Sequence, residues 1–249
     1  IITSDWSSDV CSSDLMKPST NLPNTTDDGQ RFCAPREILL QSAMFRLGEV
    51  ENEIRSGYEV LRKYHKTVTI FGSARIKETN KYYKLAMAIA KKLSNQGYTI
   101  ITGGGGGIME ASNRGAFEAN GNSVGFNIKL PHEQSLNSHT TDSFSFQHFA
   151  PRKIVMTLYA DAYIFFPGGF GTLDELGEIL TLVQTGKTTK APIVLFGSEF
   201  WHLFNEFICT EMRDKEQLIT PGDESIYTIT DDIDEAVDLV LKNKTYCEH

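Results

Sequence analysis

"YTIITGGGGGIMEASNRGAFEANG", residues 98–121, decides the fold class. A short run rich in β-branched residues comes first, the five glycines of residues 103–107 follow, and the rest has the composition of a helix that stops at a glycine. A strand that passes through a tight turn into a helix is the repeating unit of α/β proteins. The fold class then depends on whether this unit recurs along the chain.

The unit recurs on both sides of this stretch. Apolar runs bounded by turn residues predict strands, and runs of helical periodicity between them predict helices. The further strands that we expect are residues 67–73, 122–128, 161–167, 191–197 and 224–230, and the further helices are 81–97, 151–160, 171–186, 198–215 and 231–244. The polar segment between residues 128 and 151 is expected to hold no regular element.

Alternating strands and helices of this length predict an α/β fold. We expect a Rossmann-like, three-layer, doubly wound and mostly parallel sheet, because near-continuous apolar strands are typical of sheets buried on both faces. This domain is expected to occupy residues 66–244. Apolar residues at helical spacing predict an N-terminal helical extension over residues 31–65, formed of one or two helices that cap the domain or contact a second subunit.

Residues 1–30 are expected to stand apart from the fold. Residues 7–10 and 12–15 repeat Ser-Ser-Asp followed by an apolar residue, without the basic start and apolar middle of a signal peptide. We expect a non-native leader with Met16 as the start of the protein, followed by a disordered polar segment.

Composition excludes several classes of partner. The chain has 249 residues and a net charge of -8, with no basic stripe, so no nucleic acid is expected to bind. No apolar run reaches the ~20 residues that span a bilayer, so no membrane association is expected. The four cysteines form no closely spaced pair, which favours a reducing compartment and a cytoplasmic location: Cys11, Cys33, Cys209 and Cys247.

Three glycine turns fall at the carboxyl ends of expected strands, where open α/β sheets bind ligands. They are Gly72-Ser73, Gly103–Gly107 and Gly168–Gly171. A helix N-terminus offers unpaired amides and a partial positive charge, so "PGGFGT" can cradle one phosphate, with the Thr172 hydroxyl beside it. Tight turns without a ligand are the alternative. Neither a dinucleotide fingerprint nor a P-loop is present, which favours a mononucleotide or sugar phosphate over NAD or ATP.

Charged residues near these turns are candidates for chemistry. Asp174 and Glu175 follow the last turn, where a carboxylate can stabilise an oxocarbenium-like transition state or orient water. Thr172 to Glu175 also spells a capping box, which is the structural alternative. Arg152 and Lys153 lie at a helix start, against the helix dipole, and can bind a phosphate; an ordinary solvated pair is the alternative.

Two further features of the loops are open to more than one interpretation. Glu133 lies in a loop on the ligand edge and is expected either to contact the base or ribose or to be a surface acid. His132, His139 and His148 lack the spacing of a metal-binding helix, so no metal site is expected.

"PGGFGTLDE", with "RK" upstream and "TGGGGGIMEASNRGA" before that, resembles the LONELY GUY family of cytokinin riboside monophosphate phosphoribohydrolases over about residues 66–243. The resemblance implies a Rossmann-like fold without NAD or another cofactor, in a homodimer or larger homo-oligomer. It implies hydrolysis of the N-glycosidic bond of a nucleoside 5′-monophosphate to free base and ribose 5-phosphate. The lysine decarboxylase label that such proteins carry has no chemical support, because no lysine lies in a context suited to pyridoxal phosphate.

The resemblance also implies roles for individual residues. Arg152 and Glu175 match the catalytic pair of the family. Substrate contacts are expected from Gly72, Ser73, Gly104, Gly105, Glu133, Lys153, Gly168, Gly169, Phe170, Gly171, Thr172, Asp174 and Thr181. The segment between Glu133 and Arg152 is more like a bacterial branch than the plant enzymes. This leaves two alternatives open: a general nucleotide nucleosidase of salvage, and a non-catalytic nucleotide or cofactor carrier.

Overall fold

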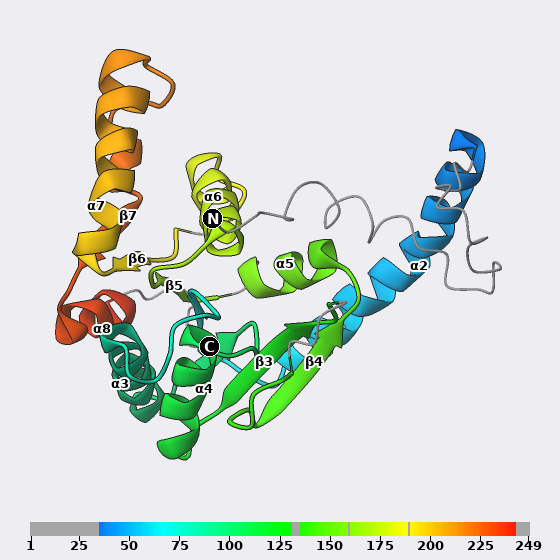
Figure 1. Cartoon of the computed structure of the whole chain (residues 1–249), viewed down its shortest axis with the longest axis horizontal. Coiled ribbons are helices and arrows are strands. Elements are labelled where there is room, and N and C mark those ends of the chain that lie inside the picture. Colours follow the sequence, from blue (N-terminus) through cyan, green and yellow to red (C-terminus); the bar gives the residue numbers. More distant parts are fainter. Residues whose placement is uncertain (1–34, 131–134, 159, 189, 243–249) are drawn as a thin grey trace, which may run out of the picture.

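Seven parallel strands form one sheet in the computed structural model, which describes residues 35–130, 135–158, 160–188 and 190–242 (Figure 1). The sheet order is β4-β3-β2-β1-β5-β6-β7, and every neighbouring pair is parallel. The strands are β1 (Thr67–Phe71), β2 (Thr99–Thr102), β3 (Ser123–Ile128), β4 (Asp142–Phe146), β5 (Ala162–Phe165), β6 (Ile193–Phe196) and β7 (Tyr227–Thr230). The predicted α/β, Rossmann-like class is confirmed, and the expected leader of residues 1–30 lies outside the described residues.

Two apolar cores, one on each face of the sheet, explain why the strands read as continuous apolar runs. Successive strand side chains point to opposite faces. In β5, Ala162 and Ile164 enter one core, whereas Tyr163 and Phe165 enter the other. Every residue of β5 is therefore buried, as a strand covered by helices on both sides requires.

Helices cover both faces of the sheet (Figure 1). One core is closed by α3 (Lys81–Asn95), α4 (Ile108–Glu118) and α8 (Ile233–Leu241). The other is closed by the C-terminal end of α2 (Arg36–Leu61), by α5 (Phe149–Thr157), by α6 (Phe170–Gln184) and by α7 (Ser198–Glu206). The result is the expected three-layer arrangement of helix, sheet and helix.

Two elements differ from the sequence-based expectation. The polar segment before α5 contains the edge strand β4. In "DSFSF" only Phe144 and Phe146 turn toward the core, and the other side chains remain partly or largely exposed, so the strand lacks the continuous apolar run of the inner strands. The expected helix 198–215 is α-helical only to Glu206 and continues as a π-helix over Phe207–Lys215.

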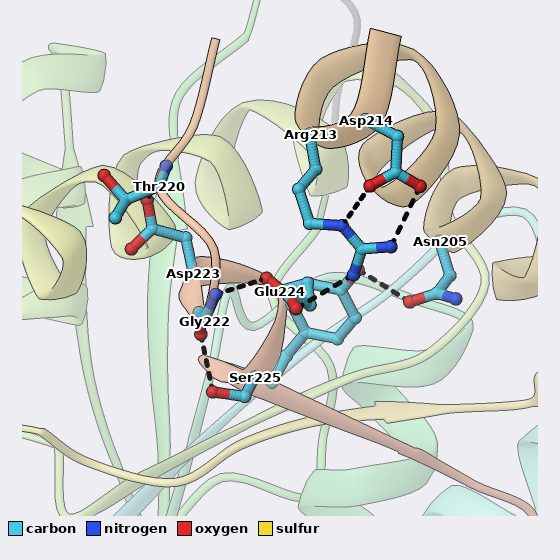
Figure 2. A network of polar contacts seen from close by, with 9 residues as sticks. Asn205, Arg213, Asp214, Thr220, Gly222, Asp223, Glu224 and Ser225 are labelled. Carbon is cyan, nitrogen blue, oxygen red and sulfur yellow. Dashed lines mark hydrogen bonds and ion pairs between the residues drawn. The ribbon is translucent and has the colours of Figure 1, made fainter. Parts of the chain in front are cut away.

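A polar network ties the π-helix to the turn that leads into β7 (Figure 2). Arg213 contacts Asp214 at 2.7 Å through Nε and Glu224 at 2.9 Å through Nη1. Glu224 in turn accepts a hydrogen bond from the Gly222 amide at 2.7 Å. From α6, Gln184 Nε2 donates to Asp223 at 2.7 Å, so the network also joins α6 to this turn.

The chain reverses its direction of growth between β1 and β5. From β1 it moves outward through β2 and β3 to β4, then returns to place β5 on the other side of β1. The three glycine turns meet here: Ser73 N donates to Pro167 O at 3.1 Å, and Ile108 N donates to Ser73 O at 3.1 Å. Ligands of open α/β sheets bind at such a switch point.

The described part of the N-terminal extension, from residue 35 on, holds one helix, α2, of which only the C-terminal half packs on the domain. Val60 and Leu61 enter the core there. Five apolar side chains of the other half are more than half exposed: Ile38, Leu40, Met44, Phe45 and Leu47. The expected contact with a second subunit stays a prediction.

Gly57 sets how closely α2 approaches the domain. A Cβ at Gly57 would lie 2.6 Å from Cγ2 of the β-branched Val155 and 3.1 Å from Cζ of Phe146. We expect Gly57→Ala to lower the free energy of unfolding by about 1–3 kcal/mol, because an extra methyl in a packed contact forces the helices apart. Gly48 has nothing within 4 Å on the same helix, so Gly48→Ala should raise it by about 0.5–1 kcal/mol. Urea unfolding measures both, and stabilisation by both substitutions would contradict this packing.

Candidate active site

A buried ion pair joins α5 to α6. Arg152 of α5 is 8% exposed, and its Nη1 lies 3.6 Å from Oε1 of Glu175 on α6. Its Nε donates to the carbonyl oxygen of Phe126, at 2.8 Å. The alternative of a solvated basic pair is therefore wrong for Arg152. A buried guanidinium held by one carbonyl and one carboxylate retains further N–H donors for an anionic ligand.

Gly103, at the end of β2, leaves room for this guanidinium. A Cβ at Gly103 would lie 2.2 Å from Nη2 of Arg152 and 2.7 Å from Sδ of Met109. Any side chain here would displace Arg152 from Glu175. The sequence marked Gly104 and Gly105 as ligand contacts, whereas the contact with the arginine falls on the glycine before them.

Burial changes the protonation of both partners. Burial raises the pKa of the Glu175 carboxyl to about 7, even though Arg152 acts in the opposite direction. Burial also lowers the pKa of Arg152, and Glu175 opposes that shift. Glu175 thus changes charge near neutral pH, which is typical of a carboxyl group used in catalysis.

The N-terminus of α6 is uncapped, which resolves the capping-box alternative. The helix begins at Phe170 with Gly169 as the N-cap residue, and no side chain in the described part of the chain caps it. Thr172 lies inside the first turn and is buried, so Thr172 and Glu175 cannot form the capping box. That interpretation is wrong because the helix starts earlier than the Thr-x-x-Glu spacing implies. The first-turn amides therefore lack a side-chain acceptor and are suited to an anion.

The glycines at this helix start differ in what they do. A Cβ at Gly168 would lie 2.1 Å from Oγ1 of Thr172, so packing alone explains that glycine. Gly169 and Gly171 have nothing within 4 Å, and neither is among the residues with positive φ. Among the described residues, neither a steric clash nor a positive φ angle accounts for glycine at these two positions. A phosphate lying on the amides would give one.

A buried polar network holds the turn between β2 and α4. Thr102 Oγ1 accepts from the Gly104 amide at 2.9 Å and donates to Oδ1 of Asn113 at 2.6 Å. Asn137 Nδ2 donates to the carbonyl oxygens of Gly104 at 3.1 Å and Gly105 at 3.0 Å, and to Asn113 Oδ1 at 2.9 Å. These three polar residues were not expected. A buried asparagine within the apolar face of a helix was a signal for Asn113, but no local pattern marks Asn137.

The first glycine turn supports the second one. A Cβ at Gly72 would lie 2.7 Å from Cγ2 of Ile108. The Ser73 hydroxyl accepts from the Arg75 amide at 3.1 Å. These contacts give Gly72 and Ser73 a packing role whether or not they also touch a substrate.

The remaining expected residues lie on the outer face of α5 and α6. Lys153 pairs with Asp174 at 2.9 Å and with Glu178 at 3.0 Å. Burial acts to lower the pKa of Lys153, but the hydrogen bonds to Asp174 and Glu178 outweigh it and raise that pKa. Thr181 donates to Gly177 O at 2.8 Å. An open hollow of about 470 Å³ is lined by Lys153, Leu173, Asp174, Gly177, Glu178, Thr181 and Leu182.

The expected site residues therefore fall into two adjoining groups. Arg152 and Glu175 lie inward, with the second glycine turn reaching Arg152 through Gly103. Lys153, Asp174 and Thr181 line the hollow outside. Phe170 is 90% exposed at the start of α6. Glu133 and His132 lie outside the described residues.

The described residues offer neither a cluster of metal ligands nor a membrane-spanning helix. No group of three or more His, Cys, Asp or Glu side chains there could hold a metal ion. Within the same residues, no helix is long and apolar enough to cross a membrane.

Comparison with known proteins places the chain in a family. A family model described as "Possible lysine decarboxylase" matches residues 109–240, more than half of the chain. A relative from Rhodococcoides fascians, named cytokinin riboside 5′-monophosphate phosphoribohydrolase, is 27% identical over 69% of this chain and 87% of its own length. The chain belongs to the LONELY GUY family.

A further relative carries the same name, and a solved structure shares the fold. A LONELY GUY protein of the same name from Mycobacterium marinum is 34% identical over 45% of this chain and 61% of its own length. Among solved structures, the molybdenum cofactor carrier protein of Chlamydomonas reinhardtii shares the fold, with a TM-score of 0.52 and 19% identity over 71% of this chain and 96% of that one. The expected enzyme class, an N-glycosyl hydrolase, agrees with the names of the curated relatives.

The raised pKa of Glu175 makes the stability of the protein depend on pH. The folded carboxyl titrates at about 7, above its value in the unfolded chain, so its contribution is full at low pH and is lost as the pH rises through about 7. Glu175→Gln cannot ionise. We expect its stability relative to the wild type to be higher at pH 8 than at pH 5, by roughly 2–3 kcal/mol. Urea unfolding at both pH values measures this, with the exposed Glu59→Gln as the control. An equal difference at both values would contradict the buried, titrating carboxyl.

Proposed function

We propose that the protein hydrolyses the N-glycosidic bond of a nucleoside 5′-monophosphate, releasing the free base and ribose 5-phosphate. The observation that carries this proposal is the buried Arg152–Glu175 pair, whose carboxyl titrates at about 7. It belongs to the same switch-point region as the uncapped helix start of α6, so one ligand with a phosphate and a reactive sugar fits the whole site. The names of the family's curated members support the same reaction.

The phosphate binds at the N-terminus of α6 in this proposal. The amides of Phe170, Gly171 and Thr172 lack a side-chain cap and carry the positive end of the helix dipole. Gly169 and Gly171 let the phosphate approach the main chain closely. The N–H donors of Arg152 that neither Phe126 nor Glu175 occupies bind an oxygen of the phosphate or ribose.

Glu175 acts on the sugar. As the bond between C1′ and the base nitrogen breaks, its electron pair leaves with the base and positive charge develops on the ribose ring. A carboxylate fixed beside that ring stabilises the charge, and it orients the water whose oxygen bonds to C1′. The released proton from water is balanced by protonation of the leaving base. Because Glu175 is held in place before the substrate arrives, little reorganisation is needed in the transition state.

The substrate is an AMP-type nucleotide, with or without an N6-prenyl group. The relatives' names favour the prenylated form, as in cytokinin activation. A general nucleotide nucleosidase would bind the phosphate and ribose in the same way and differ only at the base. A cofactor carrier on the same fold is the competing non-enzymatic function.

The first experiment offers the purified protein AMP, GMP, CMP, IMP and isopentenyladenosine monophosphate without added metal, and follows free base by chromatography. Release from the prenylated nucleotide alone identifies a cytokinin-activating enzyme, and release from several identifies a general nucleosidase.

We expect Glu175→Gln to lower kcat at least about a hundredfold, because the developing cation loses its anion. Since the ionised carboxylate is the active form, kcat/KM should rise with pH through about 7 and then level. Binding without release from any nucleotide would favour the carrier.

Gly171 tests the phosphate site separately from folding. We expect Gly171→Ala to leave the melting temperature unchanged or slightly higher, because nothing lies within 4 Å of the added methyl. The same methyl would meet a phosphate on the amides, so KM should rise by about tenfold or more, equivalent to at least ~1.4 kcal/mol of binding. Gly48→Ala, equally open but on α2, is the matched control and should leave KM unchanged. An unaltered KM in Gly171→Ala would move the phosphate elsewhere.

A further inference from the structure

The start of α5 is held by a side chain from α2. The N-cap residue of α5 is His148, and its own side chain makes no capping hydrogen bond. The Glu53 carboxylate instead holds the two residues that lead into the helix: Oε1 accepts from the Gln147 amide at 2.8 Å, and Oε2 accepts from the His148 amide at 3.3 Å. Glu53 is only 8% exposed. These contacts offset the cost of burying its charge.

The His148 ring lies against the same carboxylate. Its Nδ1 is 3.3 Å from Oε2 of Glu53, and the two side chains are 16% and 10% exposed. A serine or aspartate at position 148 would cap α5 without any contribution from α2. The residues that lead into α5 are held instead by a side chain 94 positions before Gln147, so the placement of α5 depends on the placement of α2.

A second contact fixes α5 on α2 about one helical turn further along. Gly57 permits the close approach of Val155, which lies near the middle of α5. Glu53 and Gly57 therefore hold α5 on either side of Arg152. The space for the Arg152 guanidinium is narrow, because a Cβ added at Gly103 would already clash with it. A small movement of α5 would therefore change the distance between the guanidinium and the Glu175 carboxyl.

We propose that Glu53 is a positioning residue for the reaction: by holding Gln147 and His148, which lead into α5, it places the Arg152 guanidinium against Phe126 O and Glu175. This inference rests on the proposed function of that pair. α2 lies outside the residues 109–240 that match the family model, so this positioning role would belong to a segment that the family model does not describe.

A double-mutant cycle on full-length protein tests this. Glu53→Ala should lower kcat by about a hundredfold with KM within about threefold, since misplacing a catalytic group by about 1 Å has that effect. In the Arg152→Ala background the same substitution should lower kcat less than threefold, because the group through which it acts is gone. Equal losses in both backgrounds, or normal kcat in Glu53→Ala, would overturn the proposal.

Control variants separate positioning from stability. Glu51→Ala removes an exposed glutamate of the same helix that pairs with Arg55, and kcat should not change. In Glu53→Ala/His148→Ser the serine can cap the first turn of α5 and recover part of the melting temperature, but it does not bond the Gln147 and His148 amides, so kcat should stay low. Recovery of kcat together with the melting temperature would show that Glu53 acts only through stability and overturn the proposal. If Glu53→Ala does not fold, Glu53→Gln keeps one acceptor oxygen and goes through the same cycle, with a loss of about tenfold in kcat expected.

Failure of the proposed function is distinguishable from failure of this inference. If the wild type releases no base, the cycle is run on the Kd of AMP by calorimetry. A loss of affinity in Glu53→Ala that disappears in the Arg152→Ala background supports the positioning role without catalysis. Additive losses of affinity overturn it.

Discussion

The site depends on keeping a guanidinium charged inside the protein. Arg152 is almost completely buried, yet it retains one carbonyl and one carboxylate as partners, Phe126 O and Glu175. Removing a charge from water is costly unless such partners are present. Several features of the fold exist around that requirement: the bare main chain at Gly103, the adjacency of α5 and α6, and a carboxyl group whose own pKa is raised by the same burial.

The doubly wound sheet brings these features together. Parallel strands align their carboxyl ends, and the reversal between β1 and β5 opens a space there that neither crossover covers. The turns that leave the strands are joined by main-chain hydrogen bonds from Ser73 to Pro167 and from Ile108 to Ser73. Main-chain contacts of this kind are insensitive to side-chain identity. The hollow beside Lys153 is lined by side chains. Substitutions there can change which ligand the hollow accepts while the Arg152–Glu175 pair stays in place.

Much of this architecture could be predicted from the sequence, and the exceptions have physical reasons. The buried strands are apolar at every position, whereas the edge strand β4 alternates Phe144 and Phe146 with polar residues and was missed. Arg152 and Glu175 stood out because a helix start is a poor place for a base and a phosphate site a poor place for an acid. The start of α6 at Phe170 was obscured by the Thr-x-x-Glu spacing. Gly103 and Asn137 act through contacts between segments, which no local pattern records.

The hydrogen bond from Gln147 to Glu53 spans 94 positions of the chain, and this separation has a consequence for biosynthesis. A chain made from its N-terminus completes α2 early, but α2 finds its partner only after β1 to β4 have been made. Contacts between distant segments form slowly, because a long loop must close before they do. The residues that lead into α5 thus reach their final place only after β1 to β4 have left the ribosome.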